Sequence, residues 1–376
     1  MRKLFFFFFL VLFGCEKTKT PQDVWTDTNS KILESDRISY EMKMIWEDPN
    51  FHEFDTSFYS FFSEKYPNDF FPYNYIGTTE NRSFSYISNE LKSIDHDKKT
   101  VEIILYEQFP MDFEYSASQN TYLSFSPIGL LQKEDWTYVL DTVVDNKVFM
   151  DFMRIEMDTT VDSKHVLLQQ HLFINPSNSL PEWYSRRLYH DGRRNQLIEV
   201  YFSNYNFNLQ DGLFDQQVPK DYISNLYGQK EISMKALEKG MKAPDFELYN
   251  LEGEKVRLSD FRGKKIFLDF SMINCGWCKI ALEKMNQPDF AFAENMVPFY
   301  VNPVDNPDRL KKYNEIVSIP FPVLIDAEEV GKDYGVGGYP TFFIIDENGI
   351  IELSQVGYSD SLMIQLNKFK GENTKP

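Results

Sequence analysis

Two cysteines separated by two residues, Cys275 and Cys278, are the residues of this chain best suited to carry out chemistry. They follow the apolar run 265–270 and precede a predicted helix over 279–285, so the pair lies where a strand turns into a helix. Two intervening residues let both sulfurs meet across the first helical turn. The sequence therefore predicts a dithiol that can close and reopen a disulfide.

The place of each cysteine predicts its role. A thiolate attacks a disulfide, and a helix N-terminus stabilises that anion through its unpaired N–H groups and its dipole, which lowers the cysteine pKa. We expect Cys275, at the turn, to be the exposed nucleophile. Cys278, one turn into the helix, is then the sheltered thiol that resolves the mixed disulfide.

Other uses of the two thiols are disfavoured by composition. The chain has 3 cysteines, and no histidine follows His190. A structural zinc site usually needs four ligands, and a Cys-His hydrolase needs a base next to its thiol. A purely structural disulfide across so tight a loop gains little chain entropy. We predict a redox site without a metal and without a bound cofactor.

The first residues carry a targeting signal. Arg2 and Lys3 precede the apolar stretch 4–13, which is too short to span a bilayer, and Cys15 follows shortly after it. This pattern resembles a bacterial lipoprotein signal, which implies that residues 1–14 are removed and that Cys15 becomes lipidated. An ordinary secretory signal is the alternative. Both place the chain outside the cytoplasm, where disulfides persist.

Length and composition indicate two domains. The chain has 376 residues, of which 42% are hydrophobic and 16% aromatic, including 34 Phe and 22 Tyr. Such content favours β-rich cores. The formal net charge of -18 disfavours binding to phosphate backbones, so we expect no nucleic-acid partner.

Residues 15–30 are polar and are predicted to be a tether, and residues 31–232 an antiparallel β-rich domain. Apolar and polar residues alternate over 39–46 and 149–155, and Asp191-Gly192 is typical of a hairpin turn. Helices or loops are expected near 29–38 and 122–132, and a charged connector over 230–242. The predicted strands are 38–46, 58–62, 83–87, 100–106, 136–144, 147–157, 165–174, 182–190 and 197–202.

This order of elements, a short helix followed by meandering strands, resembles the half-barrel of the lipoprotein carriers called LolA-like. The resemblance implies a half-barrel-like first domain. The abundant aromatic residues either fill its core or line an apolar groove for acyl chains or an unfolded peptide.

In residues 238–376, strands alternate with helices and end in an antiparallel hairpin, which predicts an α/β domain after an α+β one. The expected strands are 246–248, 255–258, 265–270, 296–302, 322–326, 341–345 and 350–356. The expected helices, besides the one after the cysteines, are 307–313, 328–334 and 359–369.

Four motifs in this order are similar to those of the thioredoxin fold in its extracytoplasmic TlpA/ResA and AhpC/TSA-like version. That resemblance implies a central mixed sheet flanked by helices. The motifs are Ala243-Pro244-Asp245-Phe246, Leu258-Ser259-Asp260-Phe261-Arg262-Gly263-Lys264, Cys275-Gly276-Trp277-Cys278 and Gly338-Tyr339-Pro340-Thr341-Phe342-Phe343-Ile344-Ile345-Asp346.

The resemblance also implies roles for single residues. Pro340 matches the family's cis-proline beside the dithiol, which turns the backbone of Tyr339 toward a bound peptide. Asp269 matches the buried acid that assists proton transfer with the resolving cysteine. The alternative for Asp269 is a carboxylate at a strand end that faces solvent. Trp277 is expected to contact substrate.

The chain departs from the family at Asn274, where relatives usually carry Trp, and Gly276-Trp277 lacks the common proline. Because residues at these positions tune the redox potential, reduction, oxidation and isomerisation all stay open. The Pro-x-x-x-Thr-x-x-Cys pattern of peroxiredoxins is missing before Cys275.

Together these observations predict a lipid-anchored thiol-disulfide oxidoreductase of the protein-disulfide reductase type in the bacterial cell envelope. It would face the periplasmic or extracellular side. Its expected partners are envelope proteins with disulfides or dithiols and a membrane electron donor or acceptor. One alternative is lipid, lipoprotein or peptide binding by the β domain with an accessory thioredoxin domain. Another is peroxide reduction through the same dithiol.

Overall fold

The computed structural model describes residues 19–66, 72–111, 121–161, 163–209, 218–227 and 235–367. The chain forms two compact units, Met1–Gln229 and Lys230–Pro376. The division falls at the start of the predicted connector 230–242. The predicted signal over 1–14 and Cys15 lie outside the described residues.

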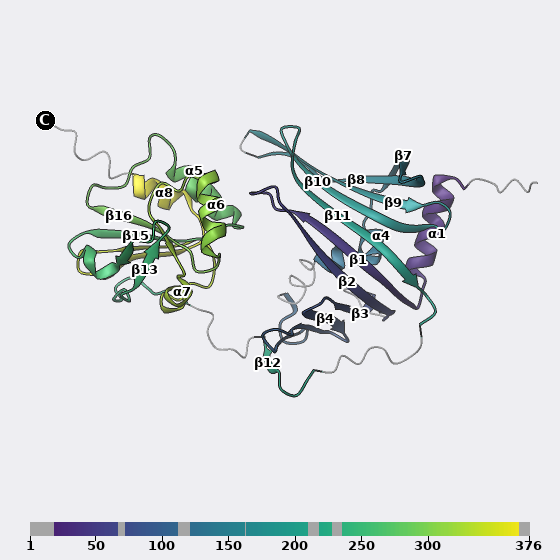
Figure 1. The fold of residues 1–376 in the computed structure, drawn as a ribbon, viewed down its shortest axis with the longest axis horizontal. Helices are drawn as coiled ribbons and strands as arrows, with labels where there is room; N and C mark the ends of the chain where they lie inside the picture. Colours follow the sequence, from purple (N-terminus) through teal and green to yellow (C-terminus); the bar gives the residue numbers. More distant parts are fainter. Residues whose placement is uncertain are drawn as a thin grey trace, which may run out of the picture. The chain divides into compact units, whose positions relative to one another are not determined.

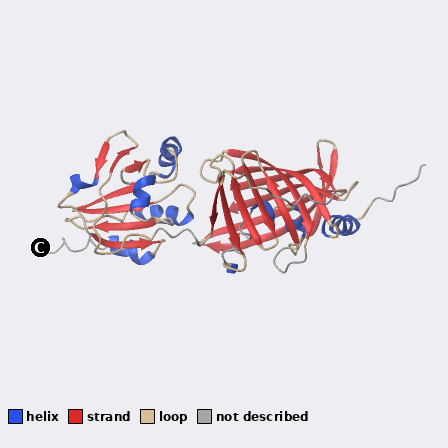
Figure 2. Ribbon diagram, turned by 90° about the horizontal axis from the view of Figure 1, so that it is seen from below, coloured by secondary structure: helices blue, strands red, loops and turns tan. Residues whose placement is uncertain are grey.

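The first unit is built on a 12-stranded sheet (Figures 1 and 2). Every neighbouring pair of strands is antiparallel except β12, which runs parallel to β6. The predicted strand-rich, antiparallel character is confirmed, and β3, β5 and β12 are additional to the predicted strands. The strands, in spatial order, are β12 (Ile223–Leu226), β6 (Thr100–Leu105), β5 (Glu90–Asp95), β4 (Arg82–Ile87), β3 (Tyr73–Thr78), β2 (Phe54–Lys65), β1 (Arg37–Glu47), β11 (Arg193–Asn206), β10 (Leu180–His190), β9 (Lys164–Asn175), β8 (Lys147–Val161) and β7 (Thr137–Val144).

Alternating side chains fix which face of this sheet is buried. In β1, Tyr40, Met42 and Met44 enter the core, while the residues between them face the other side. The predicted turn between β10 and β11 is present, with Asp191 and Gly192 both at positive φ. A turn with two positive φ values matches the right-handed twist of the strands that it joins.

Within the described part of the first unit, three helices cover the buried face: α1 (Pro21–Leu33), α3 (Thr121–Ser124) and α4 (Pro127–Leu131). The predicted tether was wrong over residues 21–30, because these residues form most of α1. Thr20 and Asp23 form a capping box, and Pro21 occupies the first turn. Val24 and Ile32 are fully buried in the core, so the segment belongs to the domain.

The sheet is open, since β12 and β7 stand at the two ends of the strand order. The described residues therefore form a mostly antiparallel sheet with helices on one face, and their strands do not close into a barrel. The LolA-like resemblance stays a prediction. Many of the aromatic side chains pack in the core, including Tyr40, Phe61, Tyr75, Phe84 and Tyr184.

The second unit has a seven-stranded mixed sheet with helices around it, as predicted (Figure 1). Central strand β15 lies between parallel β16 and antiparallel β18. In spatial order the strands are β14 (Lys255–Arg257), β13 (Glu247–Asn250), β17 (Val323–Ile325), β16 (Met296–Val301), β15 (Lys265–Phe270), β18 (Thr341–Ile345) and β19 (Ile351–Val356); the α-helices are α5 (Gly276–Met285), α6 (Pro307–Val317), α7 (Glu328–Asp333) and α8 (Asp360–Asn367).

Among the described residues, no helix combines the length and the apolar character needed to cross a membrane.

Candidate active site

The dithiol is positioned by β15 and α5. Apart from Lys265 and Asp269 the residues of β15 are apolar, and its last five side chains are buried, as is usual for a central strand of a sheet whose two faces are covered. α5 starts at Gly276, with Cys275 as its N-cap. The N–H of Cys278 donates to the Sγ of Cys275 across 3.1 Å. One of the N–H groups left free by helix geometry therefore points at the sulfur that would carry the thiolate charge.

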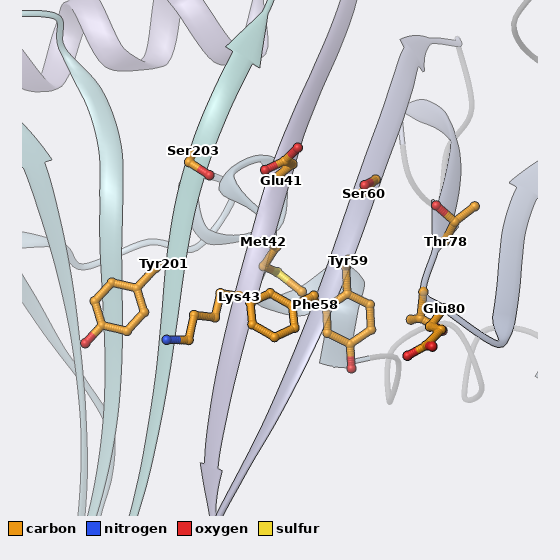
Figure 3. Close-up of a pocket in the computed structure, with 11 residues that line it drawn as sticks. Glu41, Met42, Lys43, Phe58, Tyr59, Ser60, Thr78, Glu80, Tyr201 and Ser203 are labelled. Carbon is orange, nitrogen blue, oxygen red and sulfur yellow. The ribbon is translucent and has the colours of Figure 1, made fainter.

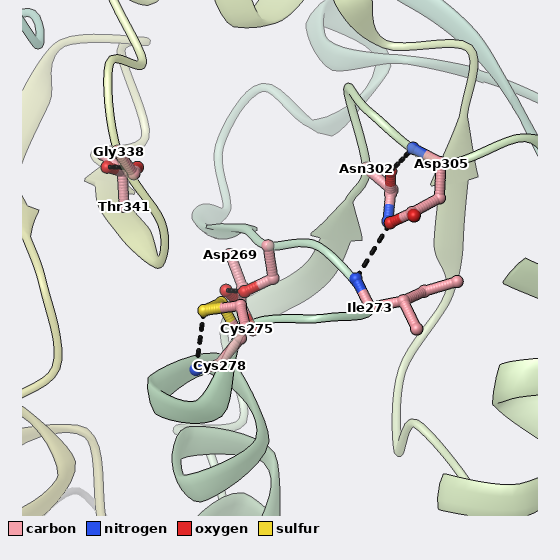
Figure 4. Close-up of a disulfide and its surroundings, with 9 residues drawn as sticks. Asp269, Ile273, Cys275, Cys278, Asn302, Asp305, Gly338 and Thr341 are labelled. Carbon is pink, nitrogen blue, oxygen red and sulfur yellow. Dashed lines mark hydrogen bonds between the residues drawn. A yellow bond between two sulfur atoms is a disulfide. The ribbon is translucent and has the colours of Figure 1, made fainter. Parts of the chain in front are cut away.

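Cys275 and Cys278 are joined in a disulfide, with their Cα atoms 5.2 Å apart (Figure 4). Cys275 is partly accessible, whereas only 1% of Cys278 is exposed. An incoming substrate can reach Cys275 and is kept from Cys278. This asymmetry suits a nucleophile followed by a resolving thiol.

Asp269 is fully buried and is one of the residues that surround the disulfide (Figure 4). Ser271 donates a hydrogen bond to its Oδ1, while its Oδ2 has no partner among the described residues. Burial raises the pKa of this carboxyl to about 7, because the charged form loses its hydration. The alternative reading of a solvent-facing strand end is wrong. A carboxyl with this pKa can exchange a proton near neutral pH.

The loop before β18 supplies Tyr339 and Pro340. Their peptide bond is cis. The hydroxyl of Thr341 donates to the carbonyl of Gly338 at 2.7 Å (Figure 4). The Gly357 N–H donates to the Pro340 carbonyl at 2.8 Å. Pro340 is buried and Tyr339 is half-buried, so the loop offers part of its surface to an incoming chain.

An aromatic pair lies next to the cysteines. Trp277 is 60% exposed, and its ring stacks on Tyr358 with the centroids 5.8 Å apart and the planes 13° from parallel. Tyr358 directly follows Gly357, whose N–H is bonded to Pro340. The dithiol turn and the cis-proline loop are thus bridged by a third segment. Sequence reasoning missed Tyr358, which is 81 residues away along the chain.

A carboxylate from the neighbouring strand's loop holds the turn before Cys275. Asp305 Oδ2 accepts from the backbone N–H of Ile273 at 2.9 Å and from Asn302 Nδ2 at 3.0 Å (Figure 4). Asn302 follows β16 as Ile273 follows β15, and the carboxyl ends of parallel strands meet at one sheet edge. This property of parallel strands could have pointed to Asn302 and Asp305 from the sequence. Neither residue was predicted.

The described residues contain no group of three or more His, Cys, Asp or Glu side chains arranged to hold a metal ion. The site consists of two sulfurs, a buried acid, a cis-proline loop and an aromatic pair in which Trp277 is exposed and Tyr358 is half-buried. Such an arrangement can exchange disulfides with a polypeptide.

Comparison with known proteins assigns the second unit to a family. The AhpC/TSA family model matches residues 239–354. The "Thioredoxin-like protein YneN" of Bacillus subtilis is 33% identical over 134 residues, which cover 35% of this chain and 77% of that protein. The chain belongs to the AhpC/TSA family.

Further relatives within the AhpC/TSA family carry an enzyme name. The "Thiol-disulfide oxidoreductase ResA" of Geobacillus thermodenitrificans is 37% identical over 119 residues, 31% of this chain and 68% of that protein. A solved structure titled as a putative "Thiol:disulfide interchange protein DsbE" from Chlorobium tepidum is 32% identical, with a TM-score of 0.32 over 36% of this chain and 96% of that one. The predicted family and the enzyme class, thiol-disulfide oxidoreductase, are confirmed.

Proposed function

We propose that this chain is a membrane-anchored, extracytoplasmic thiol-disulfide oxidoreductase that reduces protein disulfides through Cys275 and Cys278. The observation that carries the proposal is the asymmetric disulfide at the start of α5, with one accessible and one buried sulfur. The cis-proline loop and the buried acid Asp269 support it.

The reaction follows from this geometry. In the reduced enzyme, the Cys275 thiolate attacks one sulfur of a substrate disulfide, forms a mixed disulfide and releases one substrate thiolate. Asp269 accepts the proton of the Cys278 thiol. The Cys278 thiolate then attacks the Cys275 sulfur and releases the second substrate thiolate. Two electrons pass to the substrate, and the enzyme is left with its own disulfide.

The decisive experiment combines a trapping variant with a redox titration. The Cys278→Ser variant should accumulate a mixed disulfide with its substrate, and dithiothreitol should reduce this mixed disulfide. The Cys275→Ser variant should form no mixed disulfide. Equilibration of the unchanged chain in thiol buffers gives the reduction potential of the Cys275–Cys278 couple, which tells whether the enzyme reduces or oxidises its substrates. A potential of roughly −270 mV supports a reductase, and one of roughly −120 mV supports an oxidant. If no reversible couple appears, the proposal fails.

The anchor and the location belong to this proposal as well. A lipid on Cys15 would hold the enzyme in the cell envelope, close to substrate proteins and to a membrane electron donor or acceptor. Cys15→Ser should move the chain from the detergent-rich to the aqueous phase in detergent partitioning. Equal partitioning of both chains would contradict the anchor.

The alternative of acyl-chain binding by the first unit is not favoured by the cavity found on its described residues. A cavity of about 540 Å³ lies over β1, β2, β3 and β11 (Figure 3). Glu41, Lys43 and Glu80 are among its lining residues, and such charges are unsuited to a hydrocarbon chain. Peroxide reduction through the same dithiol is a second alternative. Rapid peroxide consumption that Cys275→Ser abolishes would favour it.

A further inference from the structure

An unpaired sheet edge in the first unit carries an unusual strand. β7 is the last strand of the sheet, and among the described residues only β8 pairs with it. All of its eight side chains except Thr142 are exposed, although five of the eight are Tyr, Val or Leu. Val143 is 65% exposed, Leu140 48% and Val139 43%.

Soluble proteins usually protect such an edge. Short edge strands, lysines, prolines and bulges are the common means, because unpaired N–H and C=O groups recruit other strands. β7 has one irregularity, between Tyr138 and Leu140. Beyond it the strand continues regularly to Val144 without a lysine or a proline.

The turn tells which backbone groups face outward. β7 and β8 are joined by Asp145 and Asn146, both at positive φ, so Val144 and Lys147 flank a two-residue turn. In this kind of hairpin the flanking pair is hydrogen-bonded, and the bonding alternates from there. The next pair, Val143 with Val148, is therefore not bonded within the hairpin. The N–H and C=O of Val143 point away from β8, and those of Asp141 do the same.

The chemistry of this edge selects its partner. A row of outward N–H and C=O groups is complementary to the backbone of another extended chain. The exposed Val and Leu side chains favour apolar side chains on that chain. Charge argues against a second copy, since each chain has a net charge of -18, and the only charged residue of β7 is Asp141. A basic segment complements both the negative net charge of the chain and the negative charge of Asp141.

We propose that the free edge of β7 binds an extended segment of another polypeptide, apolar and basic in character, which adds to the sheet as a further strand. This binding uses backbone hydrogen bonds and does not require a cysteine in the bound segment. It is independent of the dithiol, so it can fail or succeed apart from the proposed function.

The test uses the full chain and a fluorescein-labelled peptide of alternating valine and lysine, as long as β7. Fluorescence anisotropy should show binding to the unchanged chain. Val143→Pro removes an outward N–H without removing a hydrogen bond of the hairpin, and it should weaken binding about tenfold, the effect of roughly one lost hydrogen bond. Val143→Thr keeps the N–H and should bind nearly as tightly as the unchanged chain.

Two further measurements protect the test against misfolding and nonspecific attraction. The same peptide with N-methyl groups on alternate residues keeps its charge but loses its donors, and it should bind much more weakly. In the unchanged chain, the peptide should slow hydrogen exchange in β7 and leave exchange in β2 unaltered. Equal binding of the methylated peptide, or of Val143→Pro, would overturn the proposal. So would self-association in sedimentation that Val143→Pro abolishes while no peptide binds.

Discussion

Asp269 is a buried residue whose ionisation contributes to the pH dependence of stability in the second unit. Its pKa is about 7 in the folded chain, against an ordinary value of 3.8. Between these values the folded chain keeps a proton that the unfolded chain has released. Stability therefore falls as pH rises through this window, and the loss, on the order of a few kcal/mol, is complete above pH 7.

Asp269→Asn removes this titration and keeps the side-chain shape. We expect the variant to be more stable than the unchanged chain above pH 7 and to show a flatter stability profile between about pH 4 and 7. Chemical unfolding of the oxidised chain at several pH values checks this. Asp333→Asn, at an exposed position, is the matched control and should leave the profile unchanged. Parallel profiles for Asp269→Asn and the unchanged chain would refute the assignment.

Tyr358 is expected to contribute to recognition of polypeptide substrates and not to the chemistry. Its ring and that of Trp277 form a stacked platform beside Cys275. Tyr358→Ala should raise KM for a protein disulfide about fivefold, the effect of one lost aromatic contact, with kcat little changed. Steady-state kinetics with a protein and with oxidised glutathione test this.

For Tyr358→Ala, turnover of oxidised glutathione should stay near that of the unchanged chain, since this small disulfide has no long polypeptide segment to pack on the platform. Tyr358→Phe keeps the ring and removes the hydroxyl that bonds to Asp360, so it serves as the control. If Tyr358→Ala lowers activity equally toward the protein disulfide and oxidised glutathione, the substitution has disturbed the active-site loop and Tyr358 does not act in substrate recognition.

At the scale of secondary-structure elements, the parallel strands β15 and β16 position the loops that carry the site. The loops that follow them are joined by Asp305, which accepts hydrogen bonds from Ile273 and Asn302. Asp305→Ala leaves the Ile273 N–H without its partner and should destabilise the oxidised chain by about 1–2 kcal/mol. Asp308→Ala, three residues away and exposed, should cost less.

In the Asp305→Ala variant, Cys275 should also be easier to alkylate after reduction, because the turn before it loses the hydrogen bond from Ile273 to Asp305. Thermal unfolding and the rate of iodoacetamide labelling measure the two effects. If unfolding and labelling are both unchanged, Asp305 does not hold the turn.

Local patterns made the second unit largely predictable, whereas the first unit depended on pairing that no local pattern records. Strands such as β15 and helices such as α6 follow from apolar runs, turns and caps within a few residues. The parallel pairing of β12 with β6 joins segments over 100 residues apart. The contact of His171 with Asp151 on the neighbouring strands β9 and β8 likewise depends on strand register.

The same reasoning explains the candidate site. Cys275, Cys278, Asp269 and Pro340 were found because a motif or a fixed spacing marks them. Asp305 and Tyr358 act through the geometry of two loops, and their own neighbours in sequence carry no unusual pattern. The first part of helix α1, residues 21–28, was missed for another reason, since its many polar residues are typical of a tether.

At the scale of the whole molecule, the two compact units should unfold separately. Ile32 is fully buried between α1 and the sheet of the first unit. Ile32→Ala should destabilise that unit by about 2–5 kcal/mol and leave the potential of the Cys275–Cys278 couple unchanged. Calorimetry and redox titration of the full chain test both parts.

Ile351→Ala, at a comparably buried position of the second unit, is the matched control and should affect the other transition. A single transition that both variants lower equally would mean that the units unfold together.

The two ends of the 12-stranded sheet differ greatly in length. β7 presents eight residues, whereas β12 presents four and covers most of β6. Edge-to-edge growth of a fibre requires two edges on every subunit that can pair with another strand. Each added subunit then exposes a free edge to which the next subunit can bind. With one long edge and one short one, this sheet offers only one edge long enough for such addition. We therefore expect the short strand β12 to limit edge-to-edge polymerisation of the sheet.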